Sequence, residues 1–163
     1  MTGIVITRPI ARPGPDAEAR VFGFDDDDLR LGDEWLPSRG LTGYVHAVAA
    51  ILGLLPEATW CDTGHPSVAY IALEQRIAQF PDRDVALLWD EESGWCVALE
   101  TGTTDDPIAL SWLGRDVLPA PAVVREFVDL IMRGRLPGSL DRPRLRCSGD
   151  DDSLARRLAV YDT

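Results

Sequence analysis

The sequence predicts an α+β protein in which an antiparallel four-stranded meander sheet is flanked by an N-terminal and a C-terminal helix. Four apolar segments follow one another with only short turns between them, which is typical of a meander. An apolar stripe at helical spacing precedes these segments, and a second stripe follows them. The chain has 163 residues, of which 45% are hydrophobic, so it is long enough to bury one core without disulfides or metals.

The positions of the proline-rich, charged and apolar stretches predict that the chain has three parts. Residues 1–39 form a variable lead-in, 40–134 a single α+β domain, and 135–163 an arm that ends in a short helix over 153–160. In the lead-in, Gly3 to Thr7 reads as a short strand before a proline-rich stretch. The four carboxylates Asp25 to Asp28 repel one another and lack the spacing of a calcium loop, so we expect them in solvent.

The first helix is expected over 38–55, where Pro56 ends it, and the last over 120–133, where Gly134 suits the position after the helix. Pro121 fits the first turn of the last helix, because its missing N–H would have no partner there. The apolar stripes of the two helices contain Leu41, Tyr44, Val45, Val48, Ala49 and Leu52, and Val124, Phe127, Val128 and Ile131.

The four strands are expected over 67–74, 84–90, 94–101 and 107–113, and residues 56–66 are expected to form a connection, to which no secondary structure is assigned. Alternation along the strands places Trp89, Trp95 and Trp112 on one bulky apolar face. The opposite rows carry small residues such as Ala86 and Ala98, which suits close packing by another element. The sequence therefore predicts a sheet with one bulky and one small-residue face.

The charge of the chain limits its partners. Asp and Glu number 27 against 16 basic residues, which gives a formal net charge of −11. All the basic residues are arginines, which indicates coding bias from a GC-rich genome. A nucleic-acid surface normally shows a basic patch, so we expect no direct nucleic-acid binding. The acidic surface serves solubility, or alternatively a basic partner or DNA mimicry.

The cellular location follows from cysteines and hydropathy. Cys61, Cys96 and Cys147 are odd in number and irregularly spaced, which favours reduced thiols rather than a disulfide framework. The N-terminus has no apolar run long enough for a signal peptide, and no segment is long enough to span a membrane. We therefore expect a cytoplasmic protein without a membrane partner.

Three motifs resemble an uncharacterised actinobacterial family known only as a domain of unknown function. They are GYVHAV at 43–48, FPDRDVALLWDEESGW at 80–95 and DVLPAPAVVREFV at 116–128. The resemblance covers a little over half of the chain and implies a cytosolic actinobacterial origin. It implies no catalytic residues, and both ends of the chain lie outside it.

No constellation in the sequence predicts a reaction, so the catalytic residues stay unknown. Cys61 and His65 are four apart, but nothing supplies the rest of a nucleophile set, and their spacing with Asp62 is not that of a zinc module. We expect no metal and no cofactor. The carboxylates at 90–92 are expected at a wet hairpin tip with ordinary acidity.

The tryptophan-rich sheet remains the place to look for a site, with Tyr70, Asp84, Trp89, Asp90, Trp95 and Trp112 as candidate binding residues. The leading hypothesis is a non-enzymatic interaction or regulatory module that binds a protein partner or a second copy of itself. The alternative is a small enzyme of specialised metabolism, of cyclase or isomerase type, or a small-molecule binder, that uses a Trp-lined pocket on the sheet.

Overall fold

The computed structural model describes residues 35–102, 106–149 and 153–162, with side chains from residue 39 onward. The expected strand at Gly3 to Thr7 and the carboxylate run at Asp25 to Asp28 lie outside the described residues. Among the described residues, no helix combines the length and the apolar character needed to cross a membrane.

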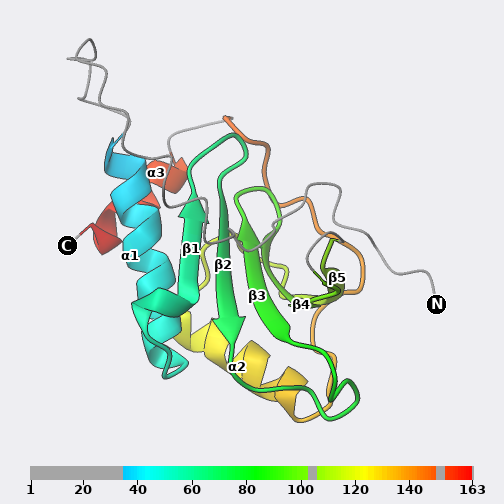
Figure 1. Cartoon of the computed structure of the whole chain (residues 1–163). Coiled ribbons are helices and arrows are strands. Elements are labelled where there is room, and N and C mark those ends of the chain that lie inside the picture. Colours follow the sequence, from blue (N-terminus) through cyan, green and yellow to red (C-terminus); the bar gives the residue numbers. More distant parts are fainter. Residues whose placement is uncertain (1–34, 103–105, 150–152, 163) are drawn as a thin grey trace.

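The described chain folds as an α+β structure around one antiparallel sheet, which confirms the predicted class and the meander (Figure 1). The strands lie side by side in sequence order, so each pairs with the one before it. Short loops between consecutive strands favour this arrangement. The strands are β1 (Thr59–Asp62), β2 (Val68–Leu73), β3 (Val85–Asp90), β4 (Gly94–Leu99) and β5 (Ile108–Trp112).

The prediction of four strands was wrong, because the sheet has five. The additional strand, β1, lies in the connection 56–66, for which the sequence predicted no strand, and Trp60 pairs with Tyr70 of β2. Its four residues are too short for alternation to stand out between Pro56 and Gly64. Pairing with β2 decides that this segment is a strand.

The helices are α1 (Trp35–Ile51), α2 (Pro121–Met132) and α3 (Ser153–Leu158), with one-turn 3-10 helices η2 (Pro56–Ala58) and η3 (Ala159–Tyr161). The helix α1 begins three residues before the predicted start and ends well before Pro56. The chain leaves it at Gly53, whose φ of 78° is accessible to glycine at little cost. Pro121 takes the first position of α2 as predicted.

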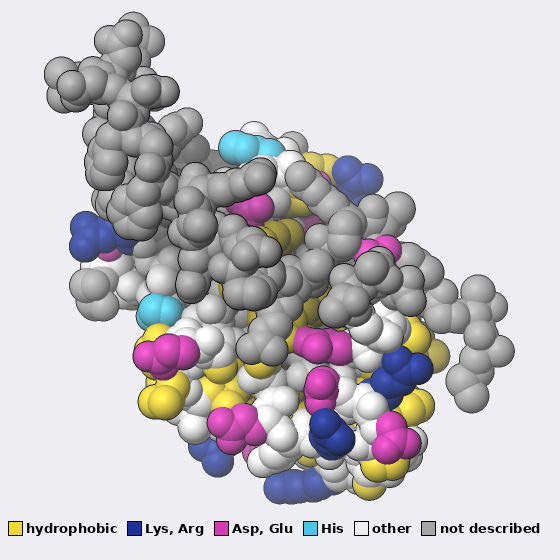
Figure 2. Space-filling view, viewed as in Figure 1, with side chains coloured by type: hydrophobic (Ala, Val, Ile, Leu, Met, Phe, Trp, Pro, Cys, Tyr) yellow, Lys and Arg dark blue, Asp and Glu magenta, His cyan; other side chains and the backbone are white. Residues whose placement is uncertain are grey.

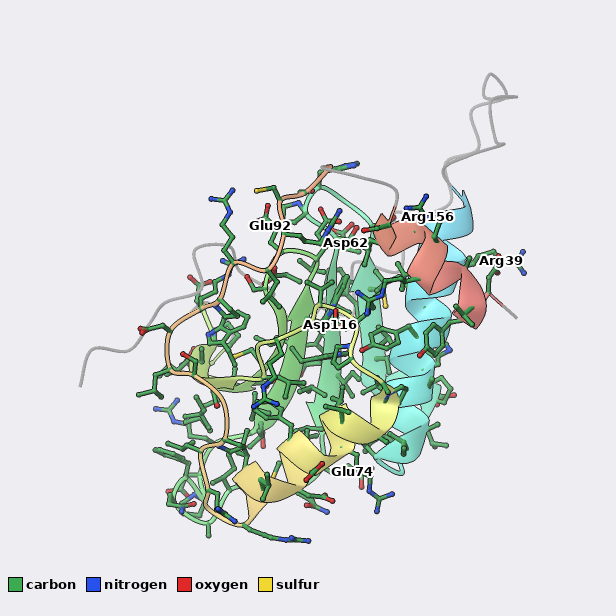
Figure 3. The ribbon with its side chains drawn as sticks, turned by 180° about the vertical axis from the view of Figure 1, so that it is seen from behind. Arg39, Asp62, Glu74, Glu92, Asp116 and Arg156 are labelled. Atoms are coloured by element: carbon green, nitrogen blue, oxygen red, sulfur yellow. The ribbon has the colours of Figure 1, made fainter. Side chains whose placement is uncertain are left out.

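The helices cover one face of the sheet, which we call the covered face (Figure 3). The apolar stripes of α1 and α2 meet Leu87, Trp89, Trp95 and Val97 in the larger core cluster, which also contains Leu154 and Leu158 of α3. The arm therefore contributes to the core through its last helix.

Buried hydrogen bonds fix the two tryptophans of the covered face. The Trp89 Nε1 donates to the backbone oxygen of Val117 at 2.6 Å. The Trp95 Nε1 donates to the Tyr44 hydroxyl oxygen at 2.9 Å, and that hydroxyl donates to the oxygen of Pro119 at 2.7 Å. Both indoles are thus satisfied, and they hold the loop between β5 and α2 against α1.

An ion pair joins this loop to α3. Two nitrogens of Arg157 donate to the two carboxylate oxygens of Asp116 at 2.8 and 2.6 Å. Figure 3 shows Asp116 between the start of α2 and α3. The Arg157 guanidinium holds the pKa of Asp116 below its usual value. Both side chains are partly exposed, so solvent screens the pair.

This pair gives a pH-dependent prediction. Because the pKa of Asp116 is lower in the folded than in the unfolded chain, its stabilisation is present above the ordinary value of 3.8 and is lost as the pH falls through the lowered pKa. We expect Asp116→Asn to lower the free energy of unfolding by about 0.5–1 kcal/mol at pH 7. Urea unfolding of both proteins should show this difference shrinking towards zero as the solution is acidified.

The matched control is Asp129→Asn, which removes an exposed pair with Arg125 within α2. It should change stability less than Asp116→Asn does. A stability loss in Asp116→Asn that persists undiminished at acidic pH would contradict the role of the charge.

Candidate functional site

The face opposite the covered face contains the second apolar cluster of the described chain. We call it the Trp112 face. One row of paired residues crosses all five strands, and each member faces the next through the strand register. This row runs Trp60, Tyr70, Leu88, Cys96 and Trp112, and the Trp112 face is defined by its buried members together with Ala86 and Ala98.

Trp112 does not lie with Trp89 and Trp95, contrary to the alternation along β5. The register shifts between Val97 and Ala98, because Ser111 pairs with Val97 while Ala109 pairs with Ala98. Leu110 is therefore an extra residue, as in a β-bulge, and every side chain beyond it changes face. The bulge moves Trp112 to the face that the sequence analysis expected to carry only small residues.

The indole of Trp112 differs from the two indoles of the covered face. Its side chain is 1% exposed, yet the Trp112 Nε1 has no acceptor among the described residues. The backbone of Trp112 is satisfied, because it exchanges hydrogen bonds with Ser139 of the arm at 2.7 and 2.9 Å. A buried N–H without an acceptor costs roughly 1–3 kcal/mol, so an acceptor brought to this donor would be stabilising.

An arginine of the arm covers one side of the Trp112 ring. The Arg142 guanidinium carbon lies 5.6 Å from the ring centroid, within the range of a cation–π contact. Asp90 accepts a hydrogen bond from Arg142 Nη2 at 3.1 Å, and Ser93 accepts one from Arg142 Nε at 2.7 Å. Asp90 also accepts from the backbone N–H groups of the β3–β4 turn. The arm thus fixes the rim of the Trp112 face.

The expectation of a wet hairpin tip was wrong. Glu91 is only 6% exposed, because the arm lies over it. Arg146 forms an ion pair with it at 3.6 Å, and the Ser148 hydroxyl donates to its carboxylate. Burial raises the pKa of Glu91, although the Arg146 guanidinium acts in the opposite direction. Figure 3 shows Glu92 at the same end of the sheet, beside the arm.

The six predicted site residues separate into three groups. Tyr70, Asp90 and Trp112 lie on or at the rim of the Trp112 face. Trp89 and Trp95 belong to the covered face. Asp84 lies at the opposite end of β3 from Asp90, where it forms an exposed ion pair with Arg76 at 2.9 Å. Sequence reasoning missed Arg142, for which the arginine-rich composition of the arm was the only signal.

A cavity of about 320 Å³ lies elsewhere, between the end of α1, the end of β2 and α2. Its lining is apolar at Leu54, Leu73 and Met132 and charged at Glu74 and Arg125. None of the six predicted residues lines it. The cavity borders the core of the covered face, because Leu54, Leu73 and Met132 pack against that core cluster, and it is separate from the Trp112 face.

The thiols near these sites are poor nucleophiles. Burial raises the pKa of Cys61 and of Cys96 to about 12, so neither forms a thiolate at neutral pH. Among the described residues, no three side chains of His, Cys, Asp or Glu gather as metal ligands do. The Trp112 face offers an apolar surface with one indole donor and an arginine rim, which suits recognition.

Fold and site together define an α+β domain with helices on one face of its sheet and, on the other, a row of five residues of which three are aromatic. Residues 44–130 match DUF6292, described as a family of unknown function, and the chain belongs to this family. The match spans the whole sheet, the second half of α1 and most of α2, but not the arm. No curated protein and no solved structure gave a significant match.

Proposed function

We propose that this protein is a non-enzymatic interaction module of the bacterial cytosol, and that the Trp112 face is where it recognises a protein partner. The observation that carries the proposal is the buried Trp112 Nε1 without an acceptor, on a face that contains Tyr70 and against which Trp60 packs. Tryptophan, tyrosine and arginine are the residues that most often dominate binding energy at interfaces.

The electrostatic setting supports a proteinaceous ligand over a nucleic acid. The net charge is −11, and Figure 2 shows acidic side chains interspersed with arginines over the lower part of the molecule. Phosphates would meet repulsion from such a surface. A partner segment with apolar side chains and a backbone carbonyl would instead complement the apolar face and the indole donor.

Affinity purification with the full-length chain tests this proposal. The bait variants are Trp112→Phe, which keeps an aromatic ring but removes the N–H, and Val123→Ala, which alters an exposed residue of α2. We expect quantitative mass spectrometry to show a partner that wild type and Val123→Ala retain, and that Trp112→Phe retains about tenfold less, as the loss of one buried hydrogen bond predicts.

The partner must then bind as a purified protein with the same dependence on Trp112. Absence of any specifically retained protein, or retention that ignores Trp112→Phe, would refute the proposal. Native mass spectrometry of the purified chain distinguishes the enzyme or small-molecule alternative, which requires a bound or convertible small molecule.

A further inference from the structure

The Trp112 face is buried within a single chain although the described helices pack elsewhere. Leu88 in the centre of this face is 1% exposed. Every residue of the cluster, including the partly buried Trp60, Val68, Ala72 and Ala109, belongs to a strand. A large side chain at the centre of a sheet cannot bury itself against its own strands alone. Another part of the chain must therefore supply the cover.

The face has the shape for a close-packed segment that crosses the strands. Next to the row from Trp60 to Trp112 runs a second row that consists entirely of alanines, again joined through the strand register. Small side chains allow a backbone to approach the sheet closely, and the neighbouring row contains the larger side chains of Trp60, Tyr70 and Trp112. The alanine row contains Ala72, Ala86, Ala98 and Ala109.

Trp112 provides an independent sign of an occupant. Its buried indole N–H has no acceptor among the described residues, and Ala109, at one end of the alanine row, lies on the same strand. A segment lying along the alanine row could present a backbone carbonyl to this donor. Such a contact would remove the cost of the unsatisfied group.

We infer that residues 1–34 of the same chain dock across the Trp112 face and occupy it in the absence of a partner. They form the one long stretch outside the described residues, since the others are 103–105, 150–152 and 163. Extended, 34 residues reach roughly 110 Å, whereas five strands span about 20–25 Å. This docking would regulate binding, because the partner of the Trp112 face would compete with the chain's own N-terminal segment. That consequence rests on the proposed function.

Charge and apolar pattern point to residues 21–28 as the anchor. Val21, Phe22 and Phe24 are the apolar side chains, and they lead directly into the carboxylates of Asp25 to Asp28. The arm beside the face carries Arg142, Arg144 and Arg146, of which Arg142 also pairs with Asp90 and Arg146 with Glu91. Figure 1 shows the start of α1 at the same end of the molecule as this part of the arm. Apolar residues on the alanine row and carboxylates against the arm would match both surfaces.

Photo-crosslinking of the purified full-length chain tests this inference without any partner. The photoreactive residue p-benzoylphenylalanine replaces the half-buried Ala109, and as a control the exposed Val123 on α2. Trypsin cleavage after Arg20 and Arg30 would release residues 21–30 as one peptide. We expect a monomer in which residue 109 is joined to this peptide, and no such product from position 123.

A second measurement uses the chain without the photoreactive residue. The double substitution Phe22→Ser/Phe24→Ser should leave the fold intact but speed hydrogen exchange of the Trp112 indole N–H by at least about tenfold. The NMR resonance of the Trp112 indole N–H is identified by its absence from the spectrum of Trp112→Phe. The same double substitution should increase partner capture, since it weakens the competitor.

Crosslinks confined to residues 35–163, crosslinks only between two chains, or unchanged indole exchange would overturn the inference. These outcomes are independent of the proposed function, because no partner is present in either measurement. If the crosslink forms but no partner is found, the proposed function fails and the docking of residues 1–34 stands.

Discussion

Trp89→Ala is expected to lower the free energy of unfolding by about 3–5 kcal/mol, the usual cost of removing a large aromatic side chain from a core. Trp89 is fully buried in the core of the covered face. Its loss leaves a cavity and also exposes the Val117 oxygen to an apolar environment without its donor. Urea or thermal unfolding monitored by circular dichroism measures the change.

Trp89→Phe separates the cost of the cavity from the cost of the lost hydrogen bond. It keeps most of the apolar volume but loses the hydrogen bond to Val117, so we expect a smaller loss of roughly 1–3 kcal/mol. Val160→Ala, at a highly exposed position, is the control and should have little effect. A Trp89→Ala protein that unfolds like wild type would show that the covered face is not the main core.

Gly43→Ala is expected to destabilise the protein by about 1–3 kcal/mol, even though alanine is the better helix former. A Cβ at Gly43 would clash with the backbone oxygen of Tyr161 in η3. Gly40, one turn earlier in α1, similarly approaches Leu158 of α3. The C-terminal segment would have to move away from α1, which would loosen Leu154 and Leu158 in the core.

The sign of the stability change in Gly43→Ala tests the close packing of α1 against the C-terminal segment. In an exposed helix, Gly→Ala stabilises by up to about 1 kcal/mol, whereas here the close backbone approach reverses the sign. Ala50→Gly, at an exposed position of α1, is the control and should cost about 1 kcal/mol through helix propensity alone. Hydrogen exchange in Gly43→Ala should increase first in residues 153–162, and stabilisation by this substitution would refute the close packing.

Together these substitutions separate the two faces of the sheet. Trp89 and Gly43 maintain the fold, and their replacement should lower partner binding only as far as it unfolds the chain. Trp112→Phe should act on recognition with a small effect on stability, because Trp112 Nε1 makes no hydrogen bond within the described part of the chain. A stability loss in Trp112→Phe as large as that in Trp89→Ala would argue for a purely structural Trp112.

Local patterns in the sequence determined the elements of the fold. Apolar residues with a period of 3.6 predicted α1 and α2. Short turns between apolar runs predicted four of the five strands as a meander. Alternation also assigned Trp89 and Trp95 correctly to one face of β3 and β4. Such patterns are readable because helix and strand periodicities depend only on neighbours along the chain.

The composition of the candidate site was decided by tertiary structure. Pairing with β2 made 59–62 a strand, and the bulge at Leu110 turned Trp112 to the other face. The buried Asp90 is paired with Arg142, which lies 52 residues further along the chain. Strand register and long-range ion pairs arise only when distant segments meet, so no local period in the sequence encodes them.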